Sequence, residues 1–99
     1  MIRHIVLFRF GDTSDATRTE SFATIAAALR PLAATIPGVN SLRVDADPKT
    51  VGTHWDAALV SEHQSWDELA AYQEHPAHHS ALAVVDPVVS ARAIVDYEL

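Results

Sequence analysis

Two short runs of consecutive apolar residues in this chain are each flanked by polar positions. The first run is Ile5 to Phe8, inside a segment that extends from Ile2 to Phe10. The second is Ala57 to Val60, inside Trp55 to Glu62. Strands that are covered on both faces have this pattern. We therefore predict that both segments are central strands of one sheet.

Two further segments have a weaker strand pattern. Val39 to Asp45 follows a Pro-Gly pair at positions 37 and 38, which suits the two central positions of a type II turn. Ala91 to Glu98 alternates in side-chain character and is predicted to be the last strand. Residues 45–52 contain many turn formers. We expect them to form a loop between antiparallel strands, at the mouth of a site.

A long helix is predicted between the first two strands. Thr13, Ser14 and Asp15 are candidate N-cap residues. Apolar residues then recur at the spacing of one helical face, at Phe22, Ile25, Ala26, Leu29, Leu32, Ala33 and Ile36. Pro31 falls opposite this face, where water can satisfy a lost backbone hydrogen bond. We therefore expect the helix to be kinked at Pro31 and to continue beyond it.

A pair of helices is predicted before the last strand. Residues 65–68 read Ser-Trp-Asp-Glu, which matches the capping box of a helix start. This helix is expected to run to about Glu74. Pro76 suits the first turn of a new helix that continues to about Val85, so the chain should bend at His75.

The order of these elements predicts an α+β domain over residues 1–99 with a split βαβ arrangement. It consists of a four-stranded antiparallel sheet with helices on one face. Right-handed crossovers place the first and third strands in the middle, in agreement with their apolar runs. The other sheet face has no cover within this chain and would expose a large apolar patch. We therefore predict a homodimer that forms through the open sheet face.

Composition and charge exclude several classes of function. The chain has thirteen Asp and Glu against seven Lys and Arg, a net charge of -6, which argues against a nucleic-acid partner. It has no cysteine, so thiolate chemistry and disulfides are excluded. No Gly-rich phosphate-binding loop occurs, and we expect no cofactor. No run of about 18 apolar residues and no export signal is visible, so we expect a cytoplasmic protein that does not contact a membrane.

Four side chains between positions 72 and 79 carry the strongest chemical signal. They are one phenol and three imidazoles, from Tyr72, His75, His78 and His79. Imidazoles titrate near physiological pH, so this cluster is either a proton-transfer site or a helix junction whose histidines bond to local backbone. The three histidines have i, i+3 and i+4 spacing. No carboxylate completes a familiar ligand set, however, and we predict no metal site.

The remaining histidines and large apolar side chains permit two interpretations each. His4 shares its strand face with Val6 and Phe8, so it either lines a cavity or is a core histidine with one partner. His54 and His63 flank the third strand and are expected at the surface. A set of large residues could line an apolar ligand pocket or fill the core, and it consists of Phe8, Phe10, Trp55, Trp66 and Leu69.

Four segments of the chain together resemble one protein family. They are the first strand from Ile2 to Phe8, the turn Ile36 to Val39, the stretch from Tyr72 to His78, and Val95 to Glu98. In this order and spacing they resemble the stress-responsive A/B-barrel domain (Dabb) family over essentially the whole chain. The resemblance implies a ferredoxin-like fold and a dimeric α/β barrel in which two sheets join with the helices outside.

The resemblance also implies a set of site residues. In a plant polyketide cyclase of this family, a tyrosine and a histidine act at the positions of Tyr72 and His78, and a strand-one histidine matches His4. A further cavity histidine on the third strand aligns with Ala57, so this chain departs from that enzyme. Many family members with the same His-Pro-Ala-His element have no established reaction, so the element is a family marker before it is a catalytic one.

The sequence thus supports one main hypothesis and several rivals. The main hypothesis is a homodimer that binds a hydrophobic carbonyl compound between sheet and helices, with ligand contacts from Phe8, Trp55, Trp66, Leu69 and His75. One rival is a cofactor-free cyclase-like lyase with His78 as base, Tyr72 as carbonyl partner and His4 in support. Others are a non-catalytic dimer that stores a ligand or protects against stress, and a cofactor-free monooxygenase of the same barrel architecture.

Overall fold

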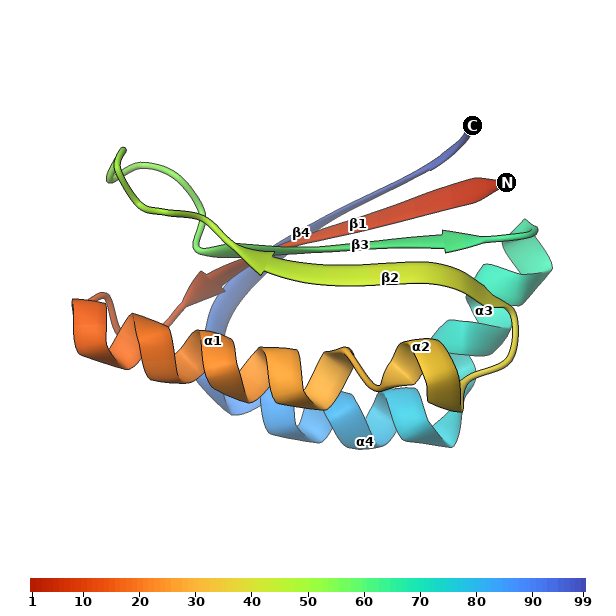
Figure 1. The fold of residues 1–99 in the computed structure, drawn as a ribbon, viewed down its shortest axis with the longest axis horizontal. Coiled ribbons are helices and arrows are strands. Elements are labelled where there is room, and N and C mark those ends of the chain that lie inside the picture. The colour runs from red at the N-terminus through yellow and green to blue at the C-terminus, as the bar shows by residue number, and fades with distance from the viewer.

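A four-stranded antiparallel sheet is covered on one face by all the helices in the computed structural model, which describes residues 1–99 (Figure 1). The sheet order is β2-β3-β1-β4. The elements in chain order are β1 (Ile2–Phe10), α1 (Asp15–Leu29), α2 (Leu32–Thr35), β2 (Val39–Ala46), β3 (Ala57–His63), α3 (Trp66–Glu74), α4 (Pro76–Val85), the 3₁₀ turn η1 (Asp86–Val88) and β4 (Val89–Glu98).

The two strands with apolar runs, β1 and β3, are the central pair, as the sequence predicts. Their register places Val6 opposite Leu59 and His4 opposite Ser61. On its other side β1 pairs with β4, where His4 lies opposite Asp96. Because directly opposed residues share a sheet face, these side chains all point toward the helices. The register therefore assembles polar groups from three strands under the helical layer.

The core lies between the sheet and the helices. Ile25 and Leu29 of α1, Tyr72 of α3 and Val85 of α4 are all at most 2% exposed. They pack against inward-facing strand residues in a cluster that includes Val6, Phe8, Phe10, Val44, Ala57 and Leu59. None of the helices is both long enough and apolar enough to cross a bilayer.

The first helical segment is interrupted at Pro31, where the sequence predicts only a kink. The α1 helix ends at Leu29, and α2 begins at Leu32. Across the interruption the hydrogen bonds take the shorter i to i−3 pattern, with the Ala33 amide donating to the Arg30 carbonyl at 3.4 Å and the Ala34 amide to the Pro31 carbonyl at 3.1 Å. Proline lacks an amide hydrogen and its ring clashes with the carbonyl of the preceding turn. In this short segment that defect ends the first helix.

The corner between α3 and α4 is formed as predicted. Ser65 accepts a hydrogen bond from the Glu68 amide at 3.2 Å, which starts α3. The α3 helix ends at Glu74, and His75 has an extended backbone with φ -65° and ψ 139°. Its Nδ1 atom accepts from the Ala77 amide at 3.0 Å and so caps α4. The corner therefore brings the last turn of α3 and the first turn of α4 over the same part of the sheet.

Gly38 forms the turn into β2 and touches the start of α3. Its φ of 84° lies in the left-handed region that favours glycine, as the type II turn requires. A Cβ atom at this position would lie 1.9 Å from Oε2 of Glu68. The turn is thus packed against the helix that carries Tyr72, which fixes the height of α3 above the sheet.

Candidate active site

A cavity of about 170 Å³ lies between the inward face of the sheet and the α3–α4 corner. Its wall is mostly apolar, with polar side chains gathered toward β1, β4 and the corner. The lining residues are His4, Val6, Phe8, Leu29, Leu59, Tyr72, Gln73, His78, Leu82, Arg92 and Ile94.

Tyr72 is the centre of an aromatic cluster at this cavity. The phenol ring is stacked on His63, with ring centroids 4.9 Å apart and an angle of 21° between the planes. His78 meets the same ring edge-on at 4.8 Å, and His4 does so at 6.3 Å. Burial raises the pKa of Tyr72 to about 12. The phenol therefore stays protonated at neutral pH and is available as a hydrogen-bond donor.

Two of the imidazoles next to Tyr72 are held in the neutral form. Burial is the main cause that lowers the pKa of both His63 and His78, because it disfavours the charged ring. The Nδ1 atoms of both rings are buried without a hydrogen-bond partner. The carbonyls of Gly38 and Gln73 lie near these rings and favour protonation, but their effect is smaller than that of burial. A neutral imidazole has a free nitrogen lone pair and can act as a base.

His4 forms a close pair with a carboxylate. Its Nδ1 atom lies 2.5 Å from Oδ1 of Asp96, across the β1–β4 ladder. The His4 side chain is 4% exposed, and that of Asp96 is 27% exposed. A carboxylate at Nδ1 holds the proton there and turns Nε2 into the acceptor. His4 therefore has a fixed ring orientation at the cavity wall.

Four of the predicted site residues meet at this cavity. Tyr72, His78 and His4 line it together, and Phe8 contributes to its apolar wall. Both interpretations of His4 are partly correct: its ring lines the cavity, and it also has one close partner, Asp96.

The structure does not bring the other four predicted ligand contacts to the cavity. Trp55 stacks under the Arg9 guanidinium at 4.3 Å and borders a hollow on the open sheet face. Trp66 is 51% exposed at the start of α3, and Leu69 is buried in the core side of that helix without lining the cavity. His75 is occupied in capping α4. We therefore leave these four residues out of the proposed site.

The prediction that His63 lies at the surface is wrong, because this side chain is 0% exposed. The signal was present in the sequence: Ala57, Leu59, Ser61 and His63 alternate along β3 and are all buried on its inner face. His63 bonds through Nε2 to the Ser61 hydroxyl at 2.9 Å. The third strand thus does supply a histidine to Tyr72, six residues beyond Ala57.

The neutral histidines should make stability depend on pH. Histidine ordinarily titrates near 6.5, and the pKa values of His63 and His78 are lowered in the folded protein. As the pH falls through this value the unfolded chain binds protons first, so the free energy of unfolding decreases. We expect this decrease to set in as the pH falls through about 6.5 and to continue below it, and to be smaller in a His63→Gln variant. Urea unfolding at several pH values measures both.

The control for this pH experiment is His54→Gln, because the side chain of His54 is 52% exposed. It should keep the full loss of stability at low pH. An equal pH dependence in the native protein and in the His63→Gln variant would contradict the assignment of a neutral, buried His63.

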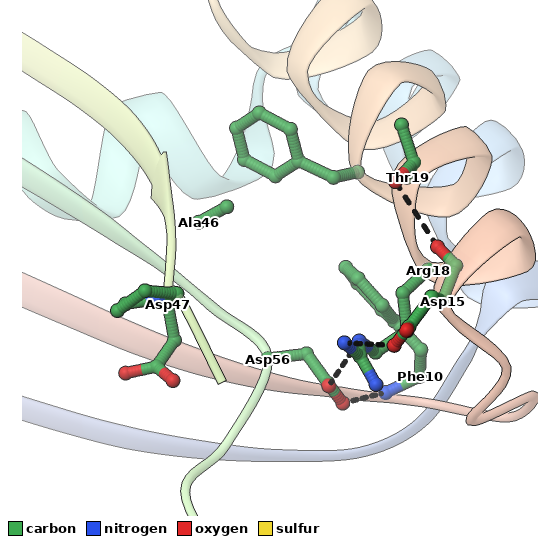
Figure 2. Close-up of a pocket in the computed structure, with 9 residues that line it drawn as sticks. Phe10, Asp15, Arg18, Thr19, Ala46, Asp47 and Asp56 are labelled. Carbon is green, nitrogen blue, oxygen red and sulfur yellow. Dashed lines mark hydrogen bonds and ion pairs between the residues drawn. The ribbon is translucent and has the colours of Figure 1, made fainter. Parts of the chain in front are cut away.

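A second hollow of about 300 Å³ lies at the other end of the sheet–helix interface, beside the β2–β3 loop (Figure 2). Figure 2 shows Asp56 and Arg18 pointing toward one another there. Asp56 accepts a hydrogen bond from the Phe10 amide at 2.8 Å, and Arg18 is paired with Asp15 at 2.7 Å. Each of these charged groups has a partner within the chain, so we assign this hollow a structural role.

Lys49 anchors the loop at this second hollow. Its ammonium donates to the carbonyls of His54 at 2.5 Å and Gly52 at 3.3 Å, and it lies 3.5 Å from Oδ1 of Asp56. The Lys49 backbone has a φ of 57°, an uncommon value for a residue other than glycine. The ammonium thus compensates the buried Asp56 carboxylate and holds the loop closed.

Replacing Lys49 by Met should lower the free energy of unfolding by about 1–3 kcal/mol, because the loop carbonyls and Asp56 lose a charged donor. Urea denaturation measures this loss. Arg43→Met is the control, since Arg43 pairs with Asp45 while its side chain is 77% exposed. Its effect should stay within about 0.5 kcal/mol. Equal effects of the two substitutions would contradict the anchoring role of Lys49.

The chain is similar to known proteins in sequence and in fold. A family model described as the stress-responsive A/B barrel domain matches residues 2–99. A dimeric protein of unknown function with a ferredoxin-like fold from Bacteroides fragilis is 29% identical, with a TM-score of 0.87, and the match covers 99% of this chain and 95% of that one. A dimeric ferredoxin-like protein of unknown function from Thermobifida fusca is 36% identical, with a TM-score of 0.82 and coverages of 99% and 90%.

The ferredoxin-like fold expected from the sequence is confirmed by these neighbours. A hydroxynitrile lyase from Passiflora edulis is also similar, with a TM-score of 0.78, 16% identity, and coverage of 99% of this chain and 92% of that one. At that identity the likeness concerns the fold. None of the curated proteins matches the chain.

Proposed function

The chain belongs to the stress-responsive A/B barrel domain family, and we propose that its cavity binds a small apolar carbonyl compound from which His78 removes a proton. The observation that carries this proposal is the position of Tyr72. A protonated, buried phenol stands between neutral imidazoles at the wall of an apolar cavity. This combination supplies a hydrogen-bond donor and a base side by side.

The size and wall of the cavity define the ligand class. A volume of about 170 Å³ is close to that of apolar protein cavities that hold a single benzene ring. Val6, Phe8 and Leu59 provide an apolar surface for such a group. The Tyr72 hydroxyl would donate to the carbonyl oxygen, because its raised pKa keeps the proton on the phenol. A ligand with one ring or a short alkyl chain next to a ketone fits these requirements.

The chemistry that follows is proton transfer next to the carbonyl group. His78 accepts a proton from the α-carbon and becomes an imidazolium, while the electrons of the C–H bond form an enolate. The enolate oxygen is stabilised by the hydrogen bond from Tyr72, in the manner of an oxyanion hole. Return of the proton restores the ketone, and attack of the enolate on a second carbonyl would form a carbon–carbon bond. His4, oriented by Asp96, is a supporting polar group beside the enolate oxygen.

The assembly in this proposal is a homodimer that forms through the open sheet face. Figure 1 shows that all helices lie on one side of the sheet and that the other side is bare. Ile5 is paired with Val60 and Val95 on that bare side, and Leu7 with Ala58 and Ala93. Val95 is 59% exposed. Both similar structures from bacteria are dimeric, and a second copy would cover this apolar surface.

The proposal is tested with phenylacetone in heavy water. The protein should accelerate exchange of the α-protons for deuterium in a saturable manner, which proton NMR follows directly. Tyr72→Phe should weaken binding and slow exchange, because the carbonyl oxygen loses its donor. Binding without exchange would contradict the proton transfer and would show a protein that only binds its ligand. Neither binding nor exchange would overturn the proposal.

A further inference from the structure

Arg92 is the one cavity-lining side chain that carries a permanent charge. It lies on β4 directly opposite Phe8 of β1, so both side chains are on the helix-facing side of the sheet. The Arg92 side chain is 31% exposed, whereas Phe8 is 2% exposed. Arg92 therefore stands at the β4 edge of the cavity, between its apolar interior and solvent. The mechanism proposed above does not use this residue.

The guanidinium of Arg92 has N–H donors that make no hydrogen bond within the chain. It is bonded within the chain through Nη2 to Oδ1 of Asp86, whose side chain is 57% exposed. A guanidinium has five N–H donors in a planar fork that matches a carboxylate. Asp86 thus takes one edge of the group and leaves the rest for a ligand. Arg92 also acts on His78, since its charge helps to lower the pKa of that imidazole.

We infer that the ligand of this cavity carries a carboxylate that Arg92 binds at the β4 edge, so that the substrate class is a small keto acid. This inference rests on the proposed function and specifies its substrate. The carbonyl group lies at Tyr72, the apolar group lies against Phe8 and Leu59, and the carboxylate reaches out toward Arg92. A chain with a net charge of -6 repels anions in general. A local cation is what an anionic ligand needs in order to enter such a protein.

Asp86 has a defined part in this arrangement. Its carboxylate competes with that of the ligand for the same guanidinium, and it also holds the Arg92 side chain at the cavity. Asp86→Asn removes the competing charge and keeps a hydrogen-bond acceptor for Arg92. The variant should therefore bind an anionic ligand more tightly than the native protein does. A purely structural Arg92–Asp86 pair would give no such gain.

The test compares 4-oxo-5-phenylpentanoate with its methyl ester, which lacks the negative charge and carries one extra methyl group, by titration calorimetry. The native protein should bind the acid at least about tenfold more tightly than the ester, as expected for a charge-assisted hydrogen bond. Arg92→Leu should abolish this preference and leave the affinity for the ester within about threefold. Arg92→Lys should retain part of it. Added salt should weaken binding of the acid alone.

Two results would overturn the inference. The first is equal affinity of the native protein for acid and ester, and the second is a preference for the acid that survives in Arg92→Leu. In either case binding of the ester would leave the proposed carbonyl site standing. If the acid, the ester and phenylacetone all fail to bind, both the carbonyl site and the keto-acid inference are contradicted.

Discussion

Replacement of His78 by Gln is expected to slow the exchange of phenylacetone α-protons by about 10² to 10⁴-fold, the usual contribution of a positioned base. Glutamine keeps a polar side chain of similar reach but cannot accept a proton at neutral pH. The affinity for the ketone should change by less than about threefold, because the carbonyl contact is made by Tyr72 and the apolar wall. Exchange is followed by proton NMR and binding by calorimetry.

The matched control is His79→Gln. His79 is the next residue along α4 and is exposed, with its ring 6.3 Å from that of His78. Its replacement should change the exchange rate far less than that of His78, because His79 acts on His78 only through its charge. A full rate in His78→Gln together with a lost rate in His4→Gln would contradict our assignment and give the role of base to the His4–Asp96 pair.

Leu7→Asp is expected to convert the dimer into a folded monomer. Leu7 lies on the open face of the central strand β1, between Ala58 and Ala93 of the neighbouring strands. In a face-to-face dimer a carboxylate there would be buried without a partner, which costs several kcal/mol. In the monomer the same carboxylate faces water. Sedimentation velocity at low micromolar concentration gives the mass, and circular dichroism checks the fold.

The control for this experiment introduces the same charge on the opposite side of the molecule. Ala83 is exposed on α4, and Ala83→Asp should remain dimeric. A dimer that survives Leu7→Asp but is lost in Ala83→Asp would place the interface on the helices. A native protein that is monomeric at the same concentration would contradict the account of the open face altogether.

The elements that the sequence predicts most accurately are those with strong local signals. The bounds of β1 agree at both ends, the capping box at Ser65 marks the start of α3, and Pro76 marks the bend at His75. The sequence predicts the start of β3 too early, at Trp55, whereas the strand begins at Ala57. In the structure the Asp56 amide bonds to the Phe8 carbonyl and the Asp56 carbonyl accepts from the Asp47 amide, so these residues close the loop before the regular ladder begins.

The candidate site is less accessible to sequence reasoning because its parts come from distant segments. Tyr72 and His78 are near one another along the chain, and the helix corner explains their contact. The His4–Asp96 pair depends on the β1–β4 register, which joins residues far apart in sequence. Arg92 reaches the cavity through the same register. The position of His63 at the end of a strand favours surface exposure, whereas the alternation along β3 correctly predicts its burial.

The most direct test of the carbonyl site is to observe the imidazoles while the ligand binds. Long-range nitrogen–proton NMR spectra resolve the histidine side chains during titration with phenylacetone. We expect saturable shifts, with one common dissociation constant, for His78 and for His63, both of which contact the Tyr72 ring. The signals of the exposed His54 and His79 should stay in place. Shifts confined to His54 and His79, or no saturable shift at all, would contradict a carbonyl-binding site at Tyr72 and His78.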